Sequence, residues 1–191
     1  AEAAAVDVRD ASAVSAAFAR IAAEVGPIDV LVNSAGGGPL GRFRDQDAET
    51  WSKIISLNLF GVVNCTRAVL DGMCDRGWGR VITIASVAAF SGGDIGVTAY
   101  AAGKAGAIGF SRQLAVEVAP HGVTVNCVAP GLVRPADEPY DSSTHPRGAA
   151  IPAGRAGHPD DIGAVCAYLA SEEASWVTGQ TFHVNGGSYT T

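Results

Sequence analysis

Residues 80–106 have the sequence RVITIASVAAFSGGDIGVTAYAAGKAG, and this stretch decides the fold. It opens with an apolar run, 81–85, of the length and composition typical of a buried strand. A loop containing glycine and serine follows, and helical patterning begins near residue 98. A buried strand followed by a helix is the unit from which parallel sheets are built.

The same alternation continues on both sides of this stretch. It predicts an α/β fold, a Rossmann-type doubly wound parallel sheet with helices on both faces. The expected strands are 4–8, 29–33, 81–85, 123–128 and 181–184. The expected helices are one capped by Asp10 or Ser12, then 48–75, 98–118 and one with Pro159 in its first turn. In this last helix, Ile162, Val165, Cys166 and Leu169 are expected to form a buried stripe.

Length and composition fit one globular domain over residues 1–191. Apolar residues make up 48% and charged residues 17% of the chain, which excludes a disordered protein. The net charge of −6 and the lack of a basic cluster argue against a nucleic-acid partner. No apolar run approaches the length of a membrane span, so no membrane partner is expected.

The four cysteines are scattered through the chain and form no Cys-x-x-Cys pair. This pattern predicts reduced thiols and no metal site. The first residues lack the basic start and apolar core of a signal peptide. Together these features predict a cytoplasmic protein. Residues 134–156, rich in proline, glycine, aspartate and serine, are expected to form a mobile loop.

Tyr100 and Lys104 carry the strongest chemical signal. They lie four residues apart in an expected helix, so their side chains share one face. A free tyrosine has a pKa near 10, and a neighbouring ammonium group lowers it. Such a phenol can exchange a proton with an alcohol or carbonyl oxygen. Ser86, at the end of the expected strand, would donate a hydrogen bond to the same oxygen.

The pair alone has a simpler explanation. An exposed tyrosine and lysine one turn apart can merely stabilise their own helix.

A dinucleotide-binding fold normally opens with a strand, a glycine-rich turn and a helix whose N-terminus holds the pyrophosphate. Nothing in this chain matches that turn. We therefore expect the fold to lack its first βαβ segment here and the domain to be N-terminally incomplete.

Several motifs in order resemble the short-chain dehydrogenase/reductase family, single-domain branch, over essentially the whole chain. AspVal at 7–8, AsnSerAlaGly at 33–36 and Asn58 come first, followed by Ser86, Tyr100 and Lys104. ProGlyLeuVal at 130–133, ThrGlyGln at 178–180 and ValAsnGlyGly at 184–187 complete the pattern. IleProAlaGlyArg at 151–155 looks closest to the bacterial 3-oxoacyl-carrier-protein reductases and related alcohol dehydrogenases.

The resemblance implies a role for each matching residue. The implied catalytic residues are Asn58, Ser86, Tyr100 and Lys104, with Asn58 ordering a water that relays protons to Lys104. The implied contacts to the cofactor, NAD or NADP, are Asp7, Val8, Asn33, Ala35, Gly36, Tyr100, Lys104, Pro130, Gly131 and Val133. For Asn33, satisfying backbone groups at a strand end is an equally good explanation. Asp7 could serve only as a cap beside the following helix.

The implied function is NAD(P)-dependent interconversion of a secondary alcohol and a ketone. The resemblance also implies that 134–156 borders the substrate and that helices 48–75 and 98–118 pair in a homo-oligomer, a dimer or tetramer. Two departures stand out: Ser86 and Tyr100 are fourteen residues apart where thirteen is commoner, and Pro135 replaces a frequent threonine. A non-catalytic nucleotide-binding sensor or scaffold on the same fold is the alternative. The substrate and the choice between NAD and NADP stay open.

Overall fold

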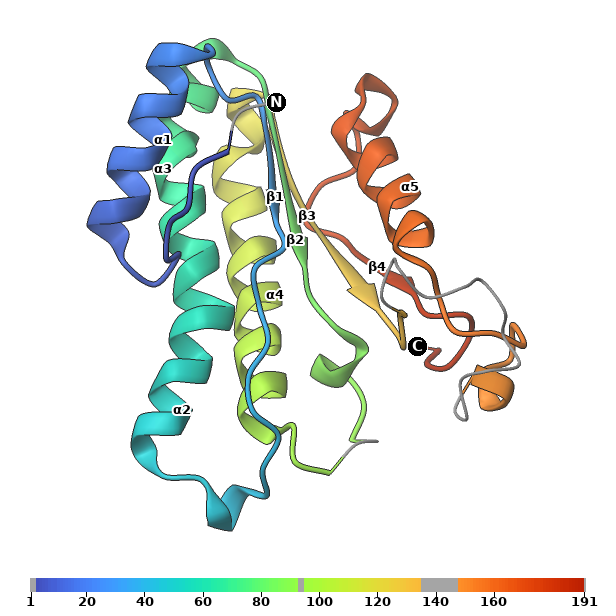
Figure 1. Ribbon diagram of the computed structural model, residues 1–191. Coiled ribbons are helices and arrows are strands. Elements are labelled where there is room, and N and C mark those ends of the chain that lie inside the picture. The colour runs from blue at the N-terminus through green and yellow to red at the C-terminus, as the bar shows by residue number, and fades with distance from the viewer. Residues whose placement is uncertain (1–2, 93–94, 135–147, 191) are drawn as a thin grey trace.

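The computed structural model describes residues 3–92, 95–134 and 148–190. Its centre is a four-stranded parallel sheet in the order β1-β2-β3-β4 (Figure 1). The strands are β1 Val30–Asn33, β2 Gly79–Ile84, β3 Val123–Pro130 and β4 Thr181–Val184. In the parallel sheet, Leu31 of β1 pairs with Val81 of β2, and Val81 pairs with Val125 of β3. The carboxyl ends of the strands therefore lie along one edge of the sheet.

Helices cover both faces of this sheet. Helices α1, α3 and α4 lie on one face and α5 on the other (Figure 1). This arrangement confirms the predicted doubly wound α/β fold. The helices are α1 Ala11–Glu24, α2 Ala48–Ile55, α3 Gly61–Arg76, α4 Thr98–Val118 and α5 Pro159–Ala170. Short 3-10 turns connect them, including Val87–Ala89 after β2 and Gly148–Ala150 before α5.

The helix starts follow from local capping. The Asp10 carboxylate accepts hydrogen bonds from the backbone N–H groups of Ser12 and Ala13 and so begins α1, as predicted. Pro159 occupies the first turn of α5, where its missing N–H has no intrahelical partner to lose. Asp161 accepts from the His158 backbone and pairs with Arg155 through 2.7 and 2.9 Å hydrogen bonds.

Two apolar clusters hold the layers together. Val81, Val123 and Val125 pack with Val14, Val69 and Met73 beneath α1, α3 and α4. On the opposite face, Ile82 and Val128 pack against Leu169 of α5. The two central strands are therefore buried on both faces, which is why their sequences are nearly continuous apolar runs.

The predicted strand over residues 4–8 is wrong. Residues 3–7 form neither strand nor helix and pair with none of the described strands, and a turn follows at 8–9. The outer edge of β1 has no strand partner among the described residues, and Val30 and Val32 are 37% and 44% exposed. An apolar run predicts a strand only where a neighbouring backbone can accept its hydrogen bonds.

The predicted helix 48–75 is one continuous helical stretch, but it contains a π-helical segment. Ser56–Phe60 joins α2 to α3 with the wider π spacing, and the Gly61 N–H bonds to the Ser56 carbonyl. Asn58 lies in this segment, fully buried. Single π turns interrupt α-helices frequently at functional sites.

The stretch Ala48–Arg76 also meets the length and composition of a membrane span, with a mean hydropathy of 1.3 over its most apolar window. It packs against α1 and α4 in the core, so it is only a weak indication of a membrane.

Of the predicted loop 134–156, residues 135–147, including Pro135, lie outside the described residues.

Candidate active site

A cavity of about 550 Å³ opens at the carboxyl ends of the strands. In doubly wound sheets, ligands bind at this edge. The cavity brings together Ser86 after β2, Tyr100 and Lys104 on α4, and Gly36 after β1. Its wall also includes Pro130, the last residue of β3, and Gly131 and Val133 just beyond it. Seven of the predicted site residues therefore share one cavity.

Tyr100 and Lys104 stand one turn apart on α4. The Lys104 Nζ lies 5.7 Å from the centroid of the Tyr100 ring. It donates a 2.6 Å hydrogen bond to the Ile84 carbonyl at the end of β2. Lys104 is only 3% exposed, and burial lowers its pKa to about 8. A buried ammonium held by a backbone carbonyl is a fixed charge, unlike a surface lysine.

Ser86 begins the 3-10 turn that follows β2. Its Oγ accepts a 3.2 Å hydrogen bond from the backbone N–H of Ala88. That contact uses an oxygen lone pair and leaves the hydroxyl proton free to donate. The turn itself is closed by the Ala89 N–H, which bonds to the Ser86 carbonyl at 3.1 Å. The Ser86 hydroxyl is thus held at the cavity wall, and its proton is available to donate a hydrogen bond.

Asn58 lies behind the cavity wall and does not line it. Its Nδ2 donates to the carbonyls of Gly37 and Ile54 at 2.7 and 2.8 Å, and its Oδ1 accepts from the Gly37 N–H at 3.0 Å. Both amide protons are therefore used. The prediction that Asn58 orders a water for a proton relay stays a prediction, because its side chain is committed to the Gly37 peptide.

Gly36 shows how closely these groups are packed. A Cβ at this position would lie 2.7 Å from Lys104 Nζ and 2.9 Å from Asn58 Oδ1. Only glycine lets the backbone come this near to the lysine. Asn58 and Gly36 together fix the loop after β1 against Lys104.

A second, smaller hollow of about 200 Å³ adjoins the first. Val8, Asn33 and Ala35 line it, together with Gly61 of α3. Val32 and Ser34 belong to the walls of both hollows. The Asn33 Nδ2 donates to Thr66 Oγ1 at 3.2 Å, so its amide serves a neighbouring helix as well as the hollow. Ten of the twelve predicted site residues therefore divide between two adjoining hollows, and Asp7 and Asn58 line neither.

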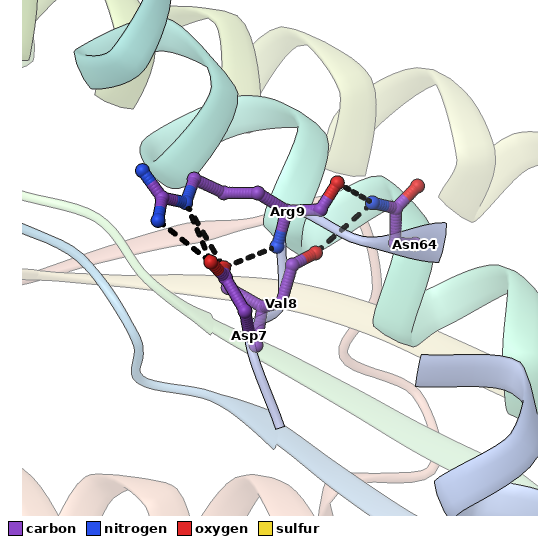
Figure 2. A network of polar contacts seen from close by, with 4 residues as sticks. All are labelled: Asp7, Val8, Arg9 and Asn64. Carbon is purple, nitrogen blue, oxygen red and sulfur yellow. Dashed lines mark hydrogen bonds and ion pairs between the residues drawn. The ribbon is translucent and has the colours of Figure 1, made fainter. Parts of the chain in front are cut away.

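Asp7 lines neither hollow. Its carboxylate is held by Arg9, whose guanidinium and backbone N–H donate to it at 2.6–3.1 Å (Figure 2). The hydrogen bonds from Arg9 lower the pKa of Asp7 to about 2, so the group is an anion at neutral pH. No pattern in the sequence predicts the contact between Asp7 and Arg9, although the two residues are only two positions apart.

Sequence reasoning missed the contribution of α5 to the cavity. Ile162, Gly163 and Cys166 of this helix line it, with Pro159 at the helix start. Ile162 and Cys166 were expected only as part of a buried stripe. All four cysteines are free thiols. Burial raises the pKa of Cys65, Cys127 and Cys166, and no cluster of metal ligands occurs within the described part of the chain.

Comparison with known proteins decides the family. Residues 1–189 match the family model described as Enoyl-(Acyl carrier protein) reductase. Nodulation protein G of Azospirillum brasilense is 44% identical over 184 residues, which cover 95% of this chain and 74% of that protein. The chain belongs to the short-chain dehydrogenase/reductase family.

Two other relatives of this short-chain dehydrogenase/reductase are named for their activities. A 3-oxoacyl-(acyl-carrier-protein) reductase of Salmonella typhimurium is 43% identical, over 96% of this chain and 76% of that protein. An acetoacetyl-CoA reductase of Cupriavidus necator is 41% identical, over 95% of this chain and 74% of that protein. As a member of the family, the protein is an oxidoreductase that acts on CH–OH groups with NAD or NADP.

The residues of the cavity fit a nicotinamide cofactor. At about 550 Å³ the cavity has the size of a small-molecule site, and it lies at the expected edge of the sheet. Gly36 leaves room beside Lys104 that any larger residue would fill. The adjoining hollow provides space for a second part of the same elongated ligand.

Proposed function

We propose that this short-chain dehydrogenase/reductase interconverts a secondary alcohol and a ketone, with Tyr100 as the general acid and base. The observation that carries the proposal is the single cavity containing Ser86, Tyr100 and Lys104. When bound, the nicotinamide supplies or accepts the hydride. The residues of the chain handle the proton and the charge on the substrate oxygen.

In the direction of reduction, the Tyr100 hydroxyl gives its proton to the carbonyl oxygen of the substrate. The free hydroxyl proton of Ser86 donates a hydrogen bond to the same oxygen. The ammonium of Lys104 stabilises the negative charge left on the phenol oxygen, and its bond to Ile84 keeps it in place. Asn58 acts behind Lys104, by holding the Gly37 peptide.

We propose that the nicotinamide half of the cofactor lies against Gly36, Tyr100, Lys104, Pro130, Gly131 and Val133. The far half then lies toward Val8, Asn33 and Ala35, in the adjoining hollow. Asp7 would offer its carboxylate from the rim, shared with Arg9.

We further propose a single domain over residues 1–191 in which segment 134–156 borders the substrate. Its described end is tied to the C-terminal turn, because the Ala153 N–H bonds to the Gly186 carbonyl at 2.9 Å. The four free cysteines support a cytoplasmic location.

The substrate class is tested by a panel of carbonyl compounds and alcohols. It contains acetoacetyl-CoA, a 3-oxoacyl carrier-protein thioester, cyclic ketones and sugars, each with NADH, NADPH or the oxidised cofactors. We expect turnover, followed by the absorbance of the reduced nicotinamide, with at least one carbonyl compound. Inactivity on every 3-oxoacyl thioester eliminates that candidate. A folded protein that binds cofactor but turns over nothing is the non-catalytic sensor or scaffold instead.

We also propose that two copies pair through α3 and α4, in a dimer or within a homotetramer. A groove of about 310 Å³ between these helices contains Leu70 and Phe110 beside the charges of Arg67, Asp71 and Glu117. A two-fold axis makes such a patch complementary to itself when opposite charges face each other.

Arg67→Glu leaves three acidic residues in this groove, so the copies should repel. We expect light scattering to show an oligomer for the parent and the mass of one chain for Arg67→Glu. The control, Arg20→Glu, places the same change on the exposed surface of α1 and should leave the oligomer intact. A parent enzyme that is active as a strict monomer contradicts the proposal.

A further inference from the structure

The turn formed by residues 7–9 has a defined shape without belonging to the sheet. Asp7 binds the backbone and the guanidinium of Arg9, and the Asp10 N–H bonds to the Asp7 carbonyl at 3.0 Å. These bonds are all internal to the turn. They shape it but do not fix its position relative to the rest of the protein.

Asn64 of α3 attaches this turn to the body of the protein. Its Nδ2 donates to the Val8 carbonyl at 2.9 Å and reaches the Arg9 carbonyl at 3.5 Å (Figure 2). Among the described residues, these hydrogen bonds join the turn to α3. One side-chain amide therefore takes the place of the ladder bonds that a strand would have made.

Gly61 makes room for the same contact one turn earlier on α3. A Cβ at Gly61 would lie 2.7 Å from Val8 Cγ2, so the Val8 side chain rests directly on the helix backbone. Gly61 and Asn64 are three residues apart and face the same way. At Gly61 the helix has no side chain to keep Val8 away from its backbone, and Asn64 provides a hydrogen-bond donor for the Val8 carbonyl.

Val8 is also part of the wall of the smaller hollow. The end of β1 and the residues just after it, 31–35, line the same hollow, and two of them, Val32 and Ser34, also line the larger cavity. The position of Val8 relative to β1 sets the width of this hollow. Asn64 does not line the hollow, yet it determines where Val8 stands.

We propose that Asn64 is a positioning residue for the half of the cofactor remote from the nicotinamide, which it serves by holding Val8 at the wall of the smaller hollow. The inference rests on the proposed function, because it needs a dinucleotide that spans both hollows. It predicts that loss of the Asn64 amide weakens binding of the adenosine half alone. The chemistry at Tyr100 lies in the other cavity and is unaffected.

The experiment uses Asn64→Leu in the full-length enzyme, because leucine matches the size of asparagine and cannot donate. AMP and nicotinamide mononucleotide serve as competitive inhibitors that represent the two halves of the cofactor. We expect Asn64→Leu to raise the inhibition constant of AMP and the KM of the dinucleotide about tenfold, the factor for one lost hydrogen bond of about 1.4 kcal/mol. The kcat and the inhibition constant of nicotinamide mononucleotide should stay the same.

Two further variants separate positioning from general damage. Asn64→Gln keeps the donor and should recover most of the AMP affinity. Asp75→Asn changes an exposed residue on the same helix and should match the parent. Equal losses for both half-cofactors, or a fall in kcat alone, overturn the inference. So does a parent that turns over substrate but is not inhibited by AMP, whereas a parent without any turnover or cofactor binding refutes the proposed function itself.

Discussion

Tyr100→Phe is expected to lower kcat by about 10²–10⁴-fold, the contribution that a positioned general acid or base typically makes. The substitution removes one oxygen and keeps the ring, so the contact with Lys104 Nζ at 5.7 Å is preserved. Ser86 would still donate a hydrogen bond to the substrate oxygen, but the phenolic proton that this oxygen receives would be missing. The loss should therefore appear in the chemical step.

Cofactor binding supplies the readout that separates catalysis from folding. The dissociation constant of the reduced dinucleotide, measured by its fluorescence, should change by no more than a few-fold in Tyr100→Phe. Tyr168→Phe is the matched control, since Tyr168 is 43% exposed on α5 and outside the cavity. If Tyr100→Phe retains turnover within tenfold of the parent, Tyr100 is not the acid and base.

Lys104→Met should have opposite effects on activity and on stability. Methionine has a similar length but no charge, so turnover should fall by at least about 10²-fold once the phenol loses its cationic neighbour. The unliganded protein should become more stable at pH 7, because a buried ammonium with one bond to Ile84 is replaced by an apolar chain. A parent-like turnover in this variant would show that the cation is not needed.

The pH dependence of that stability difference identifies its cause. Burial lowers the pKa of Lys104 from 10.5 to about 8, so the folded protein loses this proton at a lower pH than the unfolded chain does. Between pH 8 and 10.5 the unfolded state holds more protons, and stability from this group rises with pH. The advantage of Lys104→Met should therefore shrink by roughly 3 kcal/mol between pH 7 and 10.5.

Urea unfolding of the parent and of Lys104→Met at several pH values measures this change. The buried thiols titrate near the same range with the opposite sign, since their raised pKa values make folding less favourable as pH rises. The thiol of Cys65 has the same surroundings in both proteins and cancels from the difference, whereas the charge of Lys104 lowers the pKa of Cys127, so the difference reports Lys104 together with its effect on Cys127. A difference that is constant from pH 7 to 10.5 would place the charge effect elsewhere.

The sequence predicted the parts of the fold that are specified locally. The helix 98–118 and the strand 181–184 have the predicted bounds, because each is a clear periodic run between turn residues. The strand at 4–8 failed, since the sequence does not tell whether a neighbouring strand is present to pair with it. The only feature of the sequence that marks the π turn at Ser56–Phe60 is Asn58, an asparagine in the middle of a helix. Its side-chain amide donates a hydrogen bond to the Ile54 carbonyl, four residues earlier.

The candidate site, like the fold, was predicted from the sequence only in part. Ser86, Tyr100, Lys104 and Gly36 were predicted from motifs and meet in one cavity. Cys166 and Gly163 were not, because which face of α5 closes over β2 and β3 depends on packing between distant segments. Arg9 holding Asp7, and Asn64 holding Val8, are contacts of side chains that have no pattern of their own.

The order of the strands has a consequence for how the protein is made. The four described strands stand in the sheet in the same order as in the chain, so β2, β3 and β4 each pair with the described strand that precedes them. During synthesis, each of these three strands therefore leaves the ribosome after the neighbour with which it pairs. We expect the sheet to grow in the direction of translation, with β4, which pairs only through β3, joining last.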